Sequence, residues 1–237
     1  MEISVCIPMY NESERIADTA RELSAYMIAN FKDYEIIFSD DGSTDGSADI
    51  VRSLGLPCVR VTGYSHNRGK GCAVRTAFLE ARGDFVMFTD ADLAYGTGVI
   101  KRAFDTHMAN PDAGLVIGSR NIGNDGYAGY TFIRRVASKT YIWLLGIVGG
   151  FRLSDSQCGC KGFTADAVRK IFPRCEVDGF AFDFEAILWA GKLGISIVEM
   201  PVRIINHGAS KVHVMRDAFR MLGDLNRMKK RISRAKV

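Results

Sequence analysis

The chain has 237 residues, of which 47% are hydrophobic and 24% charged. This composition allows a buried core and excludes intrinsic disorder as the main character of the chain. The formal net charge of +4 is unevenly distributed, because ten lysines and arginines but only two acidic residues lie within residues 201–237.

Strand and helix patterns alternate through the first 120 residues. Apolar runs rich in β-branched residues predict strands at 2–8, 34–39, 58–62, 84–89 and 114–119. Apolar residues at helical spacing predict helices at 13–31, 69–81 and 99–108, with a shorter helix ending at 54. This alternation is typical of a mainly parallel sheet with helices on both faces, so we expect a Rossmann-like α/β fold.

The sequence also carries signals of cellular compartment. Its six cysteines form no paired CxxC motifs, which argues against a zinc site. The N-terminus begins directly on a strand pattern rather than on a signal peptide. The longest uncharged run near the middle, at 140–151, is shorter than the roughly 20 residues that span a bilayer. We therefore expect a reducing, cytoplasmic compartment and no transmembrane helix.

Polar clusters follow three of the predicted strands, at 10–12, 40–41 and 90–92. Ligands of parallel α/β sheets bind beyond the carboxyl ends of the strands, so the three clusters predict a binding site there. Asp90 and Asp92 are two residues apart, which in extended backbone points both carboxylates the same way. Two adjacent carboxylates suit a hard cation such as Mg²⁺ or Mn²⁺. Taken alone, DAD or DDGSTDG is also explained as a solvated turn or a helix cap.

The combination of motifs is more specific than any one of them. PMYNE (8–12), DDGSTDGS (40–47), NRGKG (67–71) and DAD (90–92) occur in this order. Together they resemble the family 2 glycosyltransferases, nucleotide-sugar enzymes of the GT-A fold, over residues 3–211. The resemblance implies a nucleoside pocket lined by Pro8, Tyr10, Glu12, Asp40 and Asp41. It further implies that the donor diphosphate and its metal are held by Asp90, Ala91 and Asp92. Lys70 is a further expected nucleotide contact; a solvated lysine at a helix start is the alternative.

The second half resembles one branch of that family, the polyprenyl-phosphate hexose synthases. The motifs that carry this resemblance are GSR (118–120), DSQCGCKGF (155–163), FDFE (182–185) and GASK (208–211). Two of these stretches, DSQCGCKGF and AFDFE (181–185), look more like the glucosyl than the mannosyl members. Mannosyl relatives commonly have an arginine where this chain has Ile205, and a metal-coordinating glutamine where it has Ala94.

This second resemblance implies a reaction and an acceptor site. The expected reaction transfers glucose from UDP-glucose to a polyprenyl phosphate with inversion. The expected contacts of the acceptor phosphate are Arg120, Arg134, Ser138 and Lys211. The expected catalytic residues are Asp92, Arg120, Asp183 and Glu185, of which Asp183 or Glu185 orients the sugar or the acceptor. A GDP-mannose donor, a non-lipid acceptor and a nucleotide-sugar binding protein without turnover are the alternatives.

The expected organisation is a GT-A domain at 1–211, with a nucleotide-sugar half at 1–120 and an acceptor half at 121–211. Basic and aromatic residues mixed at about 130–151 predict an interfacial helix. Residues 212–237 read as a basic amphipathic helix suited to anionic lipid, with a plain solvated face as the alternative. No nucleic-acid module is recognisable, so we expect peripheral contact with the inner membrane face and no nucleic-acid partner. A membrane-protein anchor and a homo-oligomer both stay open.

Overall fold

The computed structural model describes residues 1–123, 146–147, 150, 152–206, 225 and 227–236. Arg134, Ser138 and Lys211 lie outside these residues, as do most of the predicted interfacial helix and the first part of the predicted C-terminal helix. The elements follow in this order: β1 (Ile3–Met9), α1 (Ile16–Asn30), β2 (Tyr34–Asp41), α2 (Ser47–Ser53), β3 (Val59–Tyr64), α3 (Lys70–Glu80), β4 (Phe85–Thr89), α4 (Gly98–Ala109), β5 (Ala113–Ser119), β6 (Cys160–Thr164), α6 (Ala165–Ile171), the 3-10 helix η1 (Phe172–Arg174), α7 (Phe182–Lys192) and β7 (Ser196–Pro201).

A seven-stranded sheet in the order β3-β2-β1-β4-β6-β5-β7 forms the centre of the described chain. The strands β1 to β4 run parallel, and β7 runs parallel to β5. In contrast, β6 runs antiparallel to both of its neighbours, β4 and β5. The predicted mainly parallel sheet is confirmed, and a reversed strand from the second half of the chain is built into its middle.

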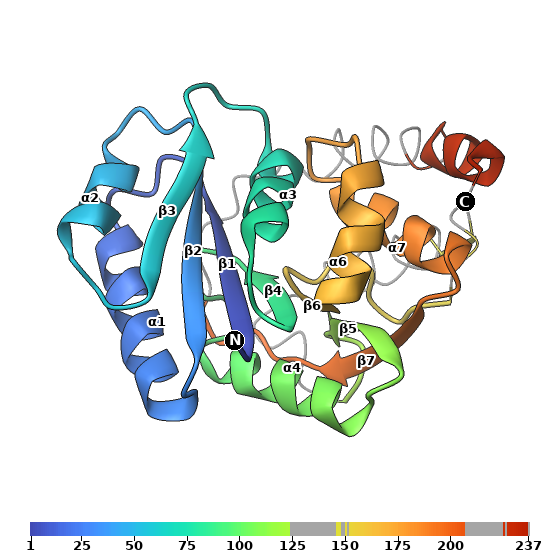
Figure 1. Cartoon of the computed structure of the whole chain (residues 1–237), viewed down its shortest axis with the longest axis horizontal. Helices are drawn as coiled ribbons and strands as arrows, with labels where there is room; N and C mark the ends of the chain where they lie inside the picture. The colour runs from blue at the N-terminus through green and yellow to red at the C-terminus, as the bar shows by residue number, and fades with distance from the viewer. Residues whose placement is uncertain (124–145, 148–149, 151, 207–224, 226, 237) are drawn as a thin grey trace, which may run out of the picture.

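Helices cover both faces of this sheet (Figure 1). On one face α1, α2 and α4 pack against residues such as Val5 and Ile7 of β1. On the other face α3, α6 and α7 pack against a cluster that includes Cys6. Neighbouring residues of β1 therefore serve opposite faces, as the two-residue period of a strand requires. The predicted fold class is confirmed.

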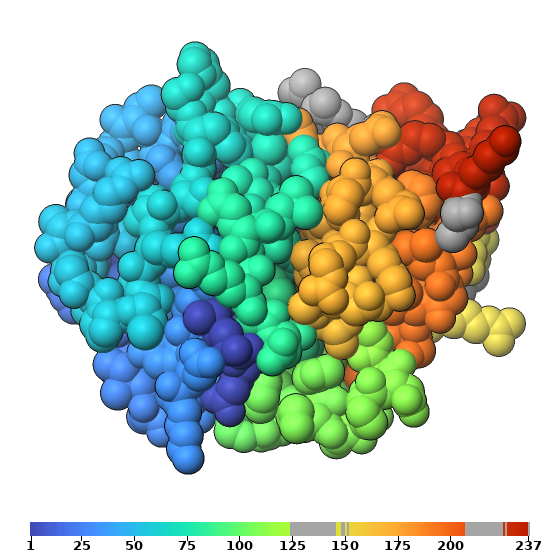
Figure 2. Space-filling model, viewed as in Figure 1, coloured from blue at the N-terminus to red at the C-terminus, as the bar shows by residue number. Residues whose placement is uncertain are grey.

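The second half of the chain lies against the first half through side chains as well as through the sheet. Figure 2 shows α3 and α6 in contact on the face turned to the viewer. Phe78 of α3 packs edge-on against Phe163 of β6, with ring centroids 5.4 Å apart, and against Phe172 at 4.6 Å. These aromatic contacts join the two halves around one core.

The last described segment is helical at 227–234 and lies beside α7 (Figure 1). Leu225, Met228 and Ile232 are buried in the same core cluster as α7. Lys229, Lys230 and other basic residues of this segment are exposed. Within the described part of the chain, no helix combines the length and the apolar character needed to cross a membrane.

Candidate active site

The carboxyl ends of β1, β2 and β4 are neighbours, because β1 lies between the other two strands. Hydrogen bonds join the loops that follow β1 and β2. The Asn11 amide donates to Oγ of Ser43 at 3.0 Å, and the Thr44 amide donates to Oδ1 of Asn11 at 2.9 Å. Asn11 has a φ of +52°, in the left-handed region that asparagine tolerates better than most residues. These hydrogen bonds therefore join the two loops into one continuous surface at the carboxyl edge of the sheet.

The residues expected around a nucleoside lie at the ends of β1 and β2 or in the loop that follows β1. Pro8 pairs with Ser39 within the sheet, and Tyr10 has 42% of its surface exposed beyond the strand. Glu12 pairs with Arg15 at 3.0 Å. These positions put an aromatic ring and an acidic side chain near the edge where the sequence predicts a ligand.

The two aspartates at the end of β2 have different surroundings. Asp40 accepts a hydrogen bond from the Ser43 amide at 3.1 Å and closes its own turn. Asp41 is buried and accepts from the Tyr64 hydroxyl at 2.6 Å. Its carboxylate also accepts from the amides of Arg68 and Gly69 at 2.8–3.0 Å. Asp41 thus holds the loop that leads into α3, a role that its place in the sequence does not reveal.

That loop delivers Lys70 to the end of β4, where the Lys70 ammonium forms an ion pair with Asp90. Burial opposes the charge on Lys70, but Asp90, Asp183 and Asp92 outweigh burial and raise its pKa. Burial raises the pKa of Asp92, and the neighbouring charge of Asp90 raises it further. A cationic side chain and two mutually repelling carboxylates therefore share one place at the carboxyl edge.

The backbone before β6 closes against this group. A Cβ on Gly159 would lie 2.1 Å from Oδ2 of Asp90, so a side chain at this position would displace the Asp90 carboxylate. Ala91, between the two aspartates, is buried, and its carbonyl accepts from the Thr19 hydroxyl at 2.7 Å. The DAD segment is therefore fixed by α1 on one side and by the 158–160 backbone on the other.

The donor set at Asp90 and Asp92 suits a hard divalent cation. Both groups are carboxylates that follow β4 two residues apart, and burial together with the charge of Asp90 raises the pKa of Asp92. Among the described residues, no cluster of three or more histidine, cysteine or acidic side chains has the geometry of a metal site. The two aspartates would therefore hold Mg²⁺ or Mn²⁺ together with water and phosphate oxygens, which octahedral Mg²⁺ accommodates.

A second charged pair, which the sequence analysis did not assign, lies next to the first. Lys161 of β6 is only 1% exposed, and its ammonium lies 2.7 Å from the Cys158 carbonyl and 3.1 Å from Oδ1 of Asp183. Burial raises the pKa of Asp183 although the two nearby lysines oppose the shift. The ammonium groups of Lys70 and Lys161 lie 5.5 and 5.7 Å from the centre of the Phe88 ring. The sequence signal that could have identified this pair is a lysine within an otherwise apolar strand.

Arg120 is fixed by a buried carboxylate. Its Nε and Nη2 donate to Asp155 at 2.6 and 3.0 Å, and its backbone N–H donates to the same group at 3.1 Å. Burial opposes the charge of Arg120, but Asp155 outweighs it and keeps the pKa of the guanidinium well above its ordinary value. The structure therefore gives Arg120 a permanent, oriented charge.

Glu185 has partners different from those of Asp183. Its fully buried carboxylate accepts from the amides of Glu176 and Val177 at 2.8–3.0 Å and forms an ion pair with Arg231. The structure thus brings Lys70, Asp90, Asp92 and Asp183 together, whereas Glu185 connects α7 to the C-terminal helix.

Two open hollows adjoin this edge. One of about 530 Å³ is bordered by Asp92, Leu93 and the N-terminal part of α1. The other, of about 730 Å³, lies between α2 and β3 and touches Asp40 and Tyr64 but neither carboxylate of the DAD segment. The smaller hollow borders Asp92, one of the paired carboxylates.

The described fold is shared with a solved glycosyltransferase. The structure matches glucosyl-3-phosphoglycerate synthase from Mycobacterium tuberculosis, in complex with Mn²⁺, UDP and phosphoglyceric acid, with a TM-score of 0.70 and 16% identity. The match covers 100% of this chain and 80% of that one. The described chain therefore has the GT-A fold.

The family model of glycosyl transferase family 2 matches residues 4–172, more than half of the chain. The chain is also 31% identical to a dolichyl-phosphate beta-glucosyltransferase of Dictyostelium discoideum, over 96% of this chain and 73% of the relative. A relative of the same name from Drosophila melanogaster is 34% identical, over 90% and 69%. The chain belongs to glycosyl transferase family 2 and is a glycosyltransferase.

Proposed function

We propose that this glycosyltransferase transfers glucose from UDP-glucose to the phosphate of a polyprenol, with inversion at the anomeric carbon. The observation that carries the proposal is the convergence of Asp90 and Asp92 with Lys70 at the carboxyl edge of the sheet. The names of the two relatives supply the sugar and the dolichyl-phosphate class of acceptor.

The donor half of the mechanism depends on charge at the leaving diphosphate. Asp90 and Asp92 would hold a divalent cation, which would supply positive charge to the departing nucleotide. Lys70 adds a fixed ammonium at the same place, since the surrounding carboxylates keep it protonated. Pro8, Tyr10, Glu12, Asp40 and Asp41 form the nucleoside side of the site, with Asp41 acting through the loop that it holds.

The acceptor half needs little proton abstraction. An alkyl phosphate has a second pKa of about 6, so its oxygen is largely ionised at neutral pH. Arg120 is one proposed phosphate ligand, pre-oriented by Asp155. Arg134, Ser138 and Lys211 complete the proposed acceptor contacts. Asp183, held by Lys161, orients the sugar or the acceptor.

The site of action that we propose is the cytoplasmic face of a membrane. A polyprenyl phosphate is lipid-embedded, so the enzyme must reach the membrane surface. The basic residues of 212–237 supply that attraction, at about 1 kcal/mol for each lysine or arginine near an anionic surface.

A soluble acceptor is the second candidate. The structural relative from Mycobacterium tuberculosis was solved with phosphoglyceric acid, a small acidic molecule. An arginine fixed directly after β5, as Arg120 is here, suits that acceptor as well as a lipid phosphate.

The test measures radiolabel transferred from UDP-glucose, UDP-galactose and GDP-mannose into a butanol-extractable product. Purified protein is supplied with a short polyprenyl phosphate and with Mn²⁺, Mg²⁺ or EDTA. Metal-dependent label from UDP-glucose is the expected result. Label from GDP-mannose alone overturns the proposed sugar. Label in a water-soluble product, seen only with phosphoglycerate, overturns the lipid acceptor.

A further inference from the structure

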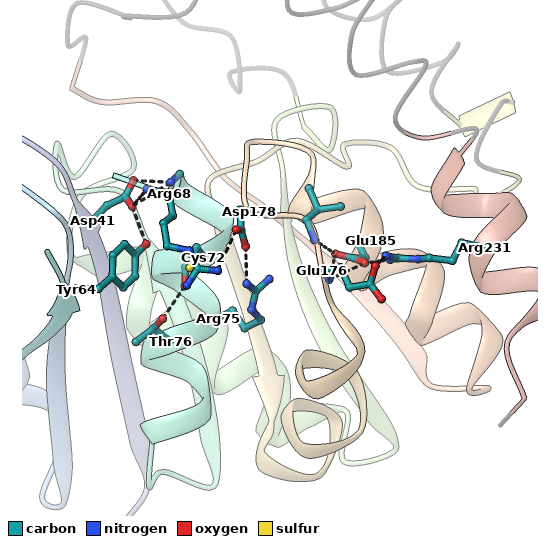
Figure 3. Close-up of polar contacts among 12 residues, drawn as sticks. Asp41, Tyr64, Arg68, Cys72, Arg75, Thr76, Glu176, Asp178, Glu185 and Arg231 are labelled. Carbon is teal, nitrogen blue, oxygen red and sulfur yellow. Dashed lines mark hydrogen bonds and ion pairs between the residues drawn. The ribbon is translucent and has the colours of Figure 1, made fainter. Parts of the chain in front are cut away.

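Two groups of polar contacts, joined by the backbone of residues 176–178, connect the C-terminal helix with the loop before α3 (Figure 3). We infer that Arg231 is a positioning residue for the donor site: by neutralising Glu185 it sets the 176–178 segment, which in turn fixes loop 67–70. This inference rests on the proposed function in one respect, because it takes loop 67–70 as part of a nucleotide-sugar site.

The first step of the chain is a buried carboxylate with one cationic partner on the C-terminal helix. Arg231 forms ion pairs with both Glu185 and Glu176. Glu185 is completely buried, and its oxygens also accept from the amides of Glu176 and Val177. Breaking a buried ion pair by removing one partner leaves an uncompensated charge, which is strongly unfavourable. Loss of Arg231 therefore leaves the buried Glu185 carboxylate without this partner, and any rearrangement that relieves its charge disturbs its hold on the two amides.

The second step is Asp178, which follows directly on those amides. Its carboxylate accepts from Arg75 at 2.5 Å and from Arg68 at 3.2 Å. Its backbone carbonyl accepts from the Cys72 amide at 3.1 Å. Three bonds from one residue thus reach both the loop before α3 and the first turns of α3.

Close backbone approach explains why this contact is tight. A Cβ on Gly69 would lie 2.5 Å from the carbonyl oxygen of Asp178, and a Cβ on Gly71 would lie 2.6 Å from that of Val177. Two glycines of the NRGKG motif therefore allow the 177–179 backbone to pack directly against the start of α3. Because backbone atoms approach each other directly here, we expect a shift of the 176–178 segment to displace loop 67–70 as well.

The third step ends at the donor edge. Arg68 and Gly69 donate their amides to Asp41, and the next residue, Lys70, forms the ion pair with Asp90. Loop 67–70 is thus held from two sides, by Asp41 in the first half of the chain and by Asp178 in the second. The position of the Lys70 ammonium depends on both anchors.

The experiment compares Arg231→Gln with Arg234→Gln, a matched change of an exposed arginine on the same helix. The dissociation constant of UDP in the presence of Mn²⁺ is measured by calorimetry. Amide hydrogen exchange of peptides that cover residues 68–72 is measured in the absence of any ligand. Arg231→Lys serves as the conservative variant that retains the charge.

The expected result is UDP binding weakened roughly three- to tenfold in Arg231→Gln, the size of effect that coupled positions produce. Exchange at 68–72 should be faster in the same variant, while Arg234→Gln behaves as wild type and Arg231→Lys recovers most of the affinity. Combining Arg231→Gln with Asp178→Asn should cost less than the sum of the single changes, because both act on one chain of contacts.

The two hypotheses fail separately. If Arg231→Gln lowers the melting temperature but leaves UDP binding and exchange at 68–72 unchanged, Arg231 has a structural role only and the inference is wrong. If the wild-type protein binds neither UDP nor GDP, the proposed function is wrong, and exchange at 68–72 alone decides whether the contacts from Arg231 reach that loop.

Discussion

Lys70, the first residue of α3, forms an ion pair with Asp90 directly after β4. This contact joins two loops whose sequences are separated by 20 residues and places a cation beside the carboxylates expected to bind a metal. A nucleotide diphosphate entering the site would meet both charges at once. The ion pair therefore links the NRGKG and DAD motifs into one unit.

Replacing Asp92 tests the metal site. Asp92→Ala removes one of two carboxylate ligands and should lower the transfer rate by about 100-fold or more with either Mg²⁺ or Mn²⁺. The exposed Asp112 provides the control. Asp112→Ala also removes one carboxylate, but Asp112 precedes β5 and so lies at the opposite end of the strands from Asp92. Near-normal turnover of Asp92→Ala would remove the metal assignment.

The Lys161–Asp183 pair allows stability to be separated from activity. Lys161→Met removes the cation in direct contact with the buried carboxylate of Asp183, leaving the charge of Lys70 nearby, and should cost about 3–5 kcal/mol in the free energy of unfolding. Adding Asp183→Asn removes the carboxylate charge, so the double variant should regain much of the stability but not the activity. Denaturant unfolding and initial rates measure the two effects. Recovery of both together would contradict a role for Asp183 at the substrate.

Two glycines on neighbouring helices make opposite predictions for the same substitution. Gly71→Ala puts a methyl group 2.6 Å from the Val177 carbonyl, so it should destabilise the fold by about 1–3 kcal/mol and impair activity. Gly191, inside α7, has no atom within 4 Å of the added Cβ. Gly191→Ala should therefore stabilise the fold by about 0.5–1 kcal/mol through helix propensity. Thermal unfolding of the two variants checks both signs.

Glu35 predicts a dependence of stability on pH. Burial acts to raise the pKa of Glu35, but hydrogen bonds from Ser4, the Arg82 amide and Arg60 outweigh burial and lower it. A carboxyl group with a lowered pKa stabilises the fold at pH values above its unfolded pKa of about 4.3, and this contribution disappears as the pH falls further. The melting temperature of Glu35→Gln should therefore lie below that of wild type at pH 7, and the two should converge as the pH falls through the lowered pKa of Glu35.

Glu22→Gln on the exposed face of α1 is the matched control for this titration. Its melting temperature should equal that of wild type at pH 7. A constant difference between wild type and Glu35→Gln from pH 7 to pH 3 would mean that Glu35 contributes through shape rather than through charge.

The first half of the fold was predictable because its signals are local. Ile16, Ala20, Leu23 and Met27 have helical spacing in the sequence, and all four are buried on α1. The strands and the glycine-rich turns follow the same logic. The insertion of β6 between β4 and β5 was not predictable, since pairing between residues 85–89 and 160–164 leaves no local pattern in either segment.

The contacts of the candidate site likewise divide into those that local sequence patterns predict and those that they do not. Asp90, Asp92 and Lys70 follow predicted strands or open a predicted helix, so the topology brings them together as expected. The contact of Lys161 with Asp183 depends on the burial of Lys161, which the presence of a lysine in the sequence does not predict. The pairing of Glu185 with Arg231, 46 residues apart, depends on where the C-terminal helix packs, and no spacing rule reports that.

The reversed strand has a consequence for how the chain can be divided. Because β5 contacts β6 and β7 but not β4, a fragment that ends after β5 would carry that strand without its partners. A fragment that begins before β6 would supply both missing neighbours at once. Two separately expressed pieces, cut between β5 and β6, should therefore reassemble into a working enzyme when mixed, whereas neither piece should fold alone. The gap left in the sheet of the first piece would act as a template that only the second can fill.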